Sequence, residues 1–360
     1  HIVLRSVLDK YQYLSKQDRA FMTRLVDGTI EYMLQLDYII DSFSKTKVRK
    51  MKPFIRNLLR MSVYQIKYMD AVPDSAVCNE AVKLAKRHKF AQLSGFVNGV
   101  IRNIARNIDS VQFDTLSIQY SMPQWIVDRF VAAYGEKKAE EIFKAFHSKS
   151  TISIRTNLTR CTQDELRVML EAEGVTVTAV DELNYAFVIS GFDYLNGLQS
   201  FRDGLFYVQD ISSMLVAQTA APKKGDYVID VCAAPGGKST HIAELLQGSG
   251  HVLARDLTDN KVDMIEENIE RHGLNNMSAE VWDATVFDAD SAGKADILIC
   301  DLPCSGLGVL GRKKDIRYKM TPESVDELTA LQRQILDTVH TYVKPNGVLV
   351  YSTCTIDEAE

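Results

Sequence analysis

From about residue 222 to its end, the chain alternates short apolar segments with segments of helical periodicity. This pattern constrains the fold more than any other feature. The apolar segments are nearly continuous runs of Val, Ile and Leu, as expected of strands buried on both faces. Repeated β–α alternation predicts a mostly parallel sheet wound with helices, which is a Rossmann-like α/β fold. The predicted strands are 226–232, 251–256, 278–283, 295–301 and 347–354, and predicted helices begin near 239, 259 and 322.

The first 110 residues differ in both pattern and charge. Apolar residues recur at helical spacing in 55–69, 76–88 and 93–108, which predicts an all-α bundle. This part contains 19 Lys and Arg against 10 Asp and Glu, although the whole chain has a formal net charge of −5. A basic module joined to an acidic remainder favours binding of a polyanion, with Arg102 and Arg106 on one helix face as candidate RNA contacts. A solvated basic surface is the alternative.

Residues 111–220 mix the two periodicities. The segments 151–157 and 186–190 alternate like strands, and a helix is predicted at 123–135. Thr162 and Glu165 have the spacing of a capping box, which predicts a further helix at 162–175. We therefore expect three domains: a helical bundle at 1–110, a small α+β subdomain at 111–220 and the α/β domain at 221–360.

A glycine-rich turn, "DVCAAPGGKSTH" (230–241), joins the first strand of the predicted sheet to a helix. Such a turn lets a ligand approach the backbone at a helix N-terminus. Its spacing matches neither the dinucleotide fingerprint nor the P-loop. Asp256 and Asp283 end the next two strands, where they suit a nucleoside, and S-adenosylmethionine would fit. Taken singly, each acid is more simply a helix cap or a solvated loop residue.

The cysteines divide into two groups. Cys304, in "DLPCSGLG", and Cys354, in "YSTCT", each follow a predicted strand at the carboxyl edge where open α/β sheets bind ligands. Cys300 lies within an apolar strand and is interpreted as core, as are Cys78 and Cys161. No CxxC pairs occur, which argues against a zinc site or a disulfide framework and favours a cytoplasmic protein without a metal. No apolar run approaches the length of a membrane span.

Two thiols at one sheet edge suit the methylation of a pyrimidine. A thiolate that adds to carbon 6 makes carbon 5 nucleophilic toward a methyl sulfonium, and an acid near N3, such as Asp301, would assist the addition. A base must then remove the carbon 5 proton before the thiol can leave. The substrate base would have to leave its stack to enter such a pocket.

The cysteine motifs and the upstream "CAAPGGKSTH" together resemble the Sun family of RNA cytosine-5 methyltransferases. The resemblance implies that Cys354 is the nucleophile, that Cys304 assists product release, and that Asp301 and Lys238 belong to the catalytic set. It also implies S-adenosyl-L-methionine as the cofactor. The implied cofactor residues are Cys232, Ala233, Ala234, Pro235, Gly236, Gly237, Lys238, Asp256, Asp283 and Asp301.

The first domain adds to the resemblance, because "RMSVYQIKYMDAVPDSAVCNEAVKLAK" and "GFVNGVIRNIAR" look like the NusB-type helical RNA-binding domain. The combination resembles bacterial enzymes of the RsmB/Sun type. It implies 16S ribosomal RNA as the partner, cytosine 967 as the target and a monomeric enzyme. A basic segment at 308–320 would suit phosphate contacts, although a solvated loop is an even alternative. Its candidate RNA-binding residues are Arg312, Lys313, Lys314 and Arg317.

Two other functions remain open from the sequence. One is a transfer-RNA cytosine-5 methyltransferase with the same chemistry, and the other is a non-catalytic RNA-binding assembly factor. Methyltransferase sheets of this kind normally continue beyond the strand that precedes Cys354. We therefore expect that a C-terminal piece is missing after Glu360.

Overall fold

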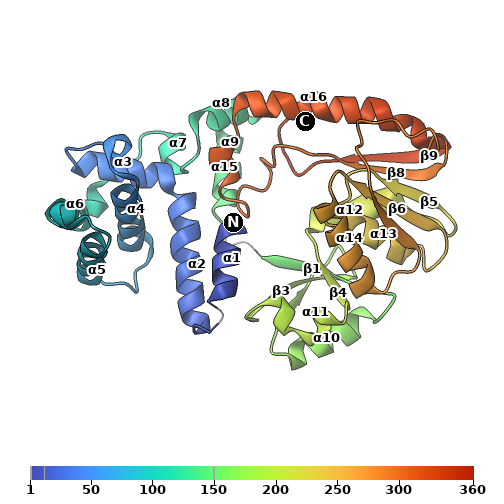
Figure 1. The fold of residues 1–360 in the computed structure, drawn as a ribbon, viewed down its shortest axis with the longest axis horizontal. Coiled ribbons are helices and arrows are strands. Elements are labelled where there is room, and N and C mark those ends of the chain that lie inside the picture. Colours follow the sequence, from blue (N-terminus) through green and yellow to red (C-terminus); the bar gives the residue numbers. More distant parts are fainter. Residues whose placement is uncertain (1, 12, 149–150) are drawn as a thin grey trace. The chain divides into compact units, whose positions relative to one another are not determined.

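The computed structural model describes residues 2–11, 13–148 and 151–360, and the chain forms two compact units. The first comprises residues 1–148 with 307–322, and the second comprises 149–306 with 323–360 (Figure 1). These units divide the chain differently from the boundaries predicted at 110 and 220. The helices up to residue 148 and a segment of the predicted α/β domain both belong to the first unit.

The first unit is helical. The helices predicted at 55–69, 76–88, 93–108 and 123–135 are confirmed as α4, α5, α6 and α8. Helix α5 begins directly after a proline, whose fixed φ suits a helix start. The helices are α1 (Ile2–Lys10), α2 (Lys16–Glu31), α3 (Met33–Phe43), α4 (Pro53–Tyr68), α5 (Asp74–Arg87), α6 (Ser94–Asn107), α7 (Leu116–Gln119), α8 (Gln124–Tyr134), α9 (Glu136–Phe146) and α15 (Ile316–Lys319).

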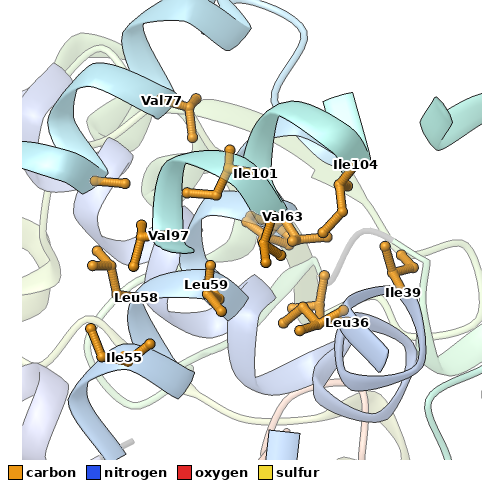
Figure 2. Packing of buried hydrophobic residues seen from close by; sticks show 14 of the residues in the cluster. Leu36, Ile39, Ile55, Leu58, Leu59, Val63, Val77, Val97, Ile101 and Ile104 are labelled. Atoms are coloured by element: carbon orange, nitrogen blue, oxygen red, sulfur yellow. The ribbon is translucent and has the colours of Figure 1, made fainter. Parts of the chain in front are cut away.

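One apolar core holds α2 to α6 together. Figure 2 shows Leu36 of α3, Leu59 and Val63 of α4, and Ile101 and Ile104 of α6 in this cluster, and all five are fully buried. Burying a side chain of this size contributes about 1.5–3 kcal/mol relative to leaving it exposed. The apolar faces of these amphipathic helices therefore meet in one core, as the predicted bundle requires.

The segment 307–322 packs within the first unit, and this position contradicts one RNA-binding prediction. Arg317 is fully buried and donates a hydrogen bond to the carbonyl oxygen of Leu310 at 3.0 Å. Gly311 fits because a Cβ there would lie 2.8 Å from the carbonyl oxygen of Phe146. The prediction that Arg317 contacts RNA is wrong, because its guanidinium is buried inside this unit and bonds a backbone carbonyl there.

The second unit contains two sheets. The smaller sheet is antiparallel, with strand order β2-β3-β1-β4, and it carries the helix predicted from the capping box, α10. The elements are β1 (Ile152–Thr156), α10 (Gln163–Ala172), β2 (Thr176–Ala179), β3 (Ala186–Ser190), α11 (Gln199–Arg202) and β4 (Phe206–Val208). The small α+β subdomain predicted from the sequence therefore has its sheet and helices within residues 152–208.

The larger sheet is fully parallel, with strand order β7-β6-β5-β8-β9, as the β–α alternation predicted. Helices α12, α13 and α14 cover one face of the sheet, and α16 covers the other. The order reverses between β5 and β8, which is where such sheets bind ligands. The elements are α12 (Ile211–Ala220), β5 (Tyr227–Asp230), α13 (Gly237–Leu245), β6 (His251–Asp256), α14 (Asp259–His272), β7 (Met277–Val281), β8 (Ala295–Asp301), α16 (Pro322–Val339) and β9 (Val343–Ser352).

Candidate active site

Within the glycine-rich segment 230–241, residues 231–236 form the turn itself, which leads from β5 into α13 at the point where the strand order reverses. These six residues are called the glycine-rich turn from here on. Gly236 precedes the helix with φ +98°, a conformation that side chains rarely adopt. A Cβ at Gly237 would lie 3.1 Å from the ring of Tyr207, which is tighter than an ordinary contact. The backbone path therefore favours glycine at 236, and the absence of a side chain at Gly237 leaves room for the ring of Tyr207.

Residues outside the turn hold it in place. Asn268 donates to the carbonyl oxygen of Pro235 at 2.9 Å, and Tyr207 donates to the same oxygen at 3.2 Å. Arg155, from the small antiparallel sheet, donates to the carbonyl oxygen of Gly237 at 2.9 Å. Sequence reasoning missed all three anchors, because nothing near them in the sequence relates them to the turn.

Asp256 lies at the carboxyl end of β6 and is almost fully buried. One carboxylate oxygen accepts from the backbone N–H of Ala234 at 2.9 Å, and the other accepts from Leu257 N–H and Lys261 Nζ, each at 2.8 Å. Asp256 thus ties β6 to the glycine-rich turn. A carboxylate has about four acceptor sites, and Asp256 uses three of them in these contacts. A contact between the remaining site and a ribose hydroxyl stays a prediction.

Asp283 follows β7 and is exposed. One of its oxygens caps the local turn by accepting from the backbone N–H and the hydroxyl of Thr285, at 2.9 and 2.7 Å. The neighbouring Trp282 packs over Arg255, with the guanidinium 4.9 Å from the ring centroid. The predicted cofactor contact of Asp283 stays a prediction.

A polar network links the turn to β8 and β9. Lys238 Nζ donates to Asp301 Oδ2 at 2.5 Å, and Ser352 donates to Asp301 Oδ1 at 2.8 Å. Below them, Ser239 donates to Asp230, and burial raises the pKa of Asp230 to about 7. The structure therefore joins Lys238 and Asp301, two residues predicted to act in catalysis, in one ion pair.

The two predicted catalytic cysteines meet at the carboxyl edge of the sheet. Their sulfur atoms, in Cys304 and Cys354, lie 3.3 Å apart, and the backbone N–H of Cys354 also points at the Cys304 sulfur at 3.3 Å. Hydrogen bonds from the Cys354 thiol and backbone, and from Gly306, outweigh desolvation and lower the pKa of Cys304 to about 7. Cys354 is the more exposed of the two. The pair can thus hold one negative charge near neutral pH, shared across a hydrogen bond.

The other cysteines of the second unit behave oppositely. Burial raises the pKa of Cys161 to about 11 and that of Cys300 to about 12, and it also raises the pKa of Cys232. These thiols stay protonated, which agrees with the interpretation of Cys161 and Cys300 as core residues. Cys304, by contrast, has a lowered pKa, so the thiol pair differs chemically from ordinary packing.

A second set of contacts, also not anticipated from the sequence, holds the loop that carries Cys304. Glu360 accepts from the backbone N–H of Ser305 at 2.8 Å, and Gln332 of α16 donates to the carbonyl oxygen of Pro303 at 2.9 Å. Gln332 also donates to Glu360 at 3.1 Å and accepts from Tyr351 at 2.9 Å. The sequence contains one indication that this loop is rigid, which is the restricted backbone of the turn at Pro303.

The remaining predicted RNA-binding residues lie in the first unit. Arg102 and Arg106 are exposed on α6, and Arg312 and Lys313 are exposed near α15. Lys314 is half-buried, and it forms an ion pair with a carboxylate of α2 at 2.5 Å. RNA contacts by these five residues stay predictions.

No group of three His, Cys, Asp or Glu side chains in residues 2–11, 13–148 and 151–360 could hold a metal ion. None of the helices in these ranges is both long and apolar enough to cross a bilayer.

The site as a whole fits a nucleoside-bearing cofactor. The turn opens at a helix N-terminus, its glycines leave room beside the backbone, and acids stand at the ends of β6 and β7. This arrangement agrees with the predicted use of S-adenosylmethionine.

Comparisons with known proteins agree with this geometry. Residues 217–360 match the family model described as 16S rRNA methyltransferase RsmB/F, residues 2–106 match the NusB family, and residues 122–192 match a ferredoxin-like domain of RsmF/B-like methyltransferases. The probable ribosomal RNA small subunit methyltransferase B of Bacillus subtilis is 38% identical, over 100% of this chain and 81% of its own length.

Solved structures share the fold. The crystal structure of PH0851 has a TM-score of 0.84 at 24% identity, covering 99% of this chain and 82% of that one. NSun6 from Pyrococcus horikoshii, solved with SFG, has a TM-score of 0.59 at 24% identity, covering 66% of this chain and 84% of that one. The resemblance inferred from the cysteine motifs and the NusB-like helices is confirmed, and the chain belongs to the RsmB/F family of ribosomal RNA small subunit methyltransferases.

Proposed function

We propose that this enzyme methylates carbon 5 of one cytosine in 16S ribosomal RNA, with cytosine 967 as the target, through a covalent bond between Cys354 and carbon 6. The observation that carries the proposal is the thiol pair, 3.3 Å between sulfurs, on the sheet edge that also presents the Lys238–Asp301 pair. The enzyme would act as a cytoplasmic monomer.

The first step uses both thiols. With Cys304 deprotonated near pH 7, the proton on the Cys354 sulfur can move to Cys304 as the Cys354 sulfur bonds to carbon 6. The π electrons of the C5–C6 bond then become available at carbon 5. A proton delivered to N3 from Asp301, relayed from the Lys238 ammonium, would neutralise the charge that the addition places on the ring.

S-adenosylmethionine, when bound, would supply the methyl group to carbon 5, with its S–CH3 bond breaking to leave S-adenosylhomocysteine; SFG, the ligand in the NSun6 structure, is an analogue of it. The glycine-rich turn, Asp256 and Asp283 would hold it. Cys304, after releasing to solvent the proton that it took from Cys354, removes the carbon 5 proton. The electron pair of that C–H bond re-forms the C5–C6 double bond as the bond between Cys354 and carbon 6 breaks, and N3 returns its proton.

The decisive experiment compares wild type with Cys354→Ala and Cys304→Ala. It measures methyl transfer from labelled S-adenosylmethionine to unmodified 16S ribosomal RNA and detects protein–RNA adducts on denaturing gels. We expect Cys354→Ala to be inactive and free of adduct, and Cys304→Ala to accumulate a covalent complex. Cys78→Ala, which removes a buried thiol from the helical core, is the control for loss of a cysteine.

The opposite assignment has one observation in its favour, because Cys304 is the thiol with the lowered pKa. If Cys304→Ala abolishes the adduct and Cys354→Ala traps it, the roles are exchanged. Methylation of transfer RNA instead of 16S ribosomal RNA would refute the substrate. RNA binding without methyl transfer by wild type would instead favour an assembly factor.

A further inference from the structure

Gln332 is a polar side chain on the buried face of α16, where it is only 3% exposed. Its amide Nε2 donates to the carbonyl oxygen of Pro303 at 2.9 Å and to Glu360 Oε1 at 3.1 Å. Its Oε1 accepts from the hydroxyl of Tyr351 at 2.9 Å. Because two acceptors face one end of the amide and a donor faces the other, these neighbours determine which way the amide points.

The contacts of Gln332 reach the residues on both sides of Cys304. Pro303, directly before the cysteine, is held by Gln332 itself. Ser305, directly after it, is held by Glu360, whose Oε1 accepts from the backbone N–H at 2.8 Å and whose Oε2 accepts from the hydroxyl. Since Gln332 also bonds Glu360, the two side chains together hold the backbone on either side of Cys304.

Strand pairing alone does not reach the two cysteines. The ladder between β8 and β9 ends with the pair Asp301 and Ser352, before either Cys304 or Cys354. The ladder brings the two following loops to one edge, but its hydrogen bonds fix only the residues within it. The contact of 3.3 Å between the sulfurs therefore depends on what holds the Cys304 loop beyond the strands.

We propose that Gln332 is a positioning residue for methyl transfer, because it holds the Cys304 loop so that the Cys304 sulfur lies within hydrogen-bond distance of the Cys354 sulfur. The proposal rests on the reaction proposed above, in which a proton passes between these sulfurs. The hydrogen bonds of Gln332 go to the loop, to β9 and to Glu360, so it acts on the reaction through the position of Cys304.

The acidity of Cys304 reports on this position. The hydrogen bond from the Cys354 thiol is the largest cause that lowers the pKa of Cys304 to about 7. Two other titratable groups face Cys304: the Glu360 carboxylate, which raises its pKa, and the hydroxyl of Tyr351. If the loop moves, the contact between the sulfurs lengthens, and the pKa should return toward the ordinary value of about 8.5.

The test compares wild type with Gln332→Met, which keeps the length of the side chain and loses its hydrogen bonds. The rate at which iodoacetamide alkylates Cys304, followed by peptide mass spectrometry without RNA or cofactor, gives the pH midpoint of thiol ionisation. The midpoint should rise from about 7 by about one pH unit. Gln334→Met, at an exposed glutamine of the same helix, is the matched control and should behave like wild type.

Methyl transfer is measured on the same variants. The kcat of Gln332→Met should fall about 10- to 100-fold, because a displacement of about 1 Å near reacting atoms can cost about 100-fold. The KM for S-adenosylmethionine should change less than about twofold, since ground-state binding of the cofactor is not affected. A role in stability alone would leave kcat of the folded variant unchanged.

Two further variants separate positioning from misfolding. Glu360→Gln keeps an oxygen for the Ser305 N–H and removes the charge that raises the pKa of Cys304, so its midpoint should fall below that of wild type. Misfolding would not move the two midpoints in opposite directions. If Gln332→Met does not fold, Tyr351→Phe replaces it, because Tyr351 is 40% exposed and donates to Gln332. Its midpoint should rise and its kcat should fall.

The outcomes divide clearly. An unchanged midpoint or an unchanged kcat in folded Gln332→Met, or in Tyr351→Phe where that variant replaces it, would overturn the proposal. If the midpoints shift as expected but wild type transfers no methyl group to RNA, the proposed function fails, and the role of Gln332 in placing the two sulfurs stands.

Discussion

Arg155 supplies the sharpest test of how the small subdomain supports the catalytic sheet. It lies on β1 and is 1% exposed, and its guanidinium bonds both carboxylate oxygens of Glu244 on α13 at 2.9 and 3.2 Å. It also donates to the carbonyl oxygen of Gly237 at 2.9 Å and to Thr240 at 3.2 Å. Arg155→Met keeps most of the buried volume but leaves the carboxylate of Glu244 buried without its cation.

Removing one partner of a buried ion pair costs about 3–5 kcal/mol, chiefly because the remaining charge is stranded. We therefore expect urea denaturation to show Arg155→Met destabilised by this amount. The double variant with Glu244→Leu should recover at least half of the loss, because no charge then remains buried. The dissociation constant for S-adenosylmethionine should rise as well, since the carbonyl of Gly237 loses its anchor. Arg333→Met, at an exposed position of α16, should change stability by less than about 0.5 kcal/mol.

Two results would refute this reasoning. A loss below about 1 kcal/mol in Arg155→Met would mean that Glu244 is not buried as described. A double variant whose loss equals the sum of the two single losses would mean that the two side chains do not interact.

Burial raises the pKa of Asp230 from 3.8 to about 7, so between these pH values the native state keeps a proton that the unfolded state has lost. The unfolding free energy of wild type should therefore fall from pH 4 to 7 relative to that of Asp230→Asn, measured by urea titration at each pH. Burial lowers the pKa of His241 below 6.5, so the sign reverses: stability should be lost as pH falls below 6.5, and less so in His241→Gln. Arg317→Met should lower the thermal midpoint, and the salt dependence of RNA binding should not change, because this side chain is buried. Arg102→Gln with Arg106→Gln should weaken RNA binding in filter assays and leave S-adenosylmethionine binding intact; equal loss of both affinities would contradict the assignment.

Much of the fold could be predicted because its signals are local. Continuous apolar runs marked β5, β6, β8 and β9, and helical spacing marked α4, α5, α6 and α14. The sheet edge that carries the candidate catalytic residues was also predictable, since parallel strands place the residues that follow them on one side. The 3.3 Å contact between Cys304 and Cys354 follows from the pairing of β8 with β9 in register.

The features that could not be predicted depend on contacts between distant segments. Arg155 lies in a strand of alternating polarity, where an arginine would be predicted to face solvent. It instead bonds Gly237 and Glu244, which are 82 and 89 positions away in the sequence. Arg317 lies in a basic segment whose composition is typical of a solvated loop. The segment nevertheless packs within the helical unit.

The thiol pair shows what geometry adds to a motif. The sequence placed two cysteines at one edge but could not assign the charge between them. Hydrogen bonds from the Cys354 thiol and backbone converge on Cys304, so the charge rests on the less exposed sulfur. In the proposed reaction, the exposed sulfur of Cys354 meets the substrate base and gives its proton to Cys304 as attack begins. A nucleophile that loses its proton to its neighbour only as it bonds to carbon is protected from side reactions at rest, and the neighbour is then positioned for the later removal of the carbon 5 proton. This division of roles agrees with the proposal that Cys354 attacks, an assignment that the resemblance to the Sun family implied.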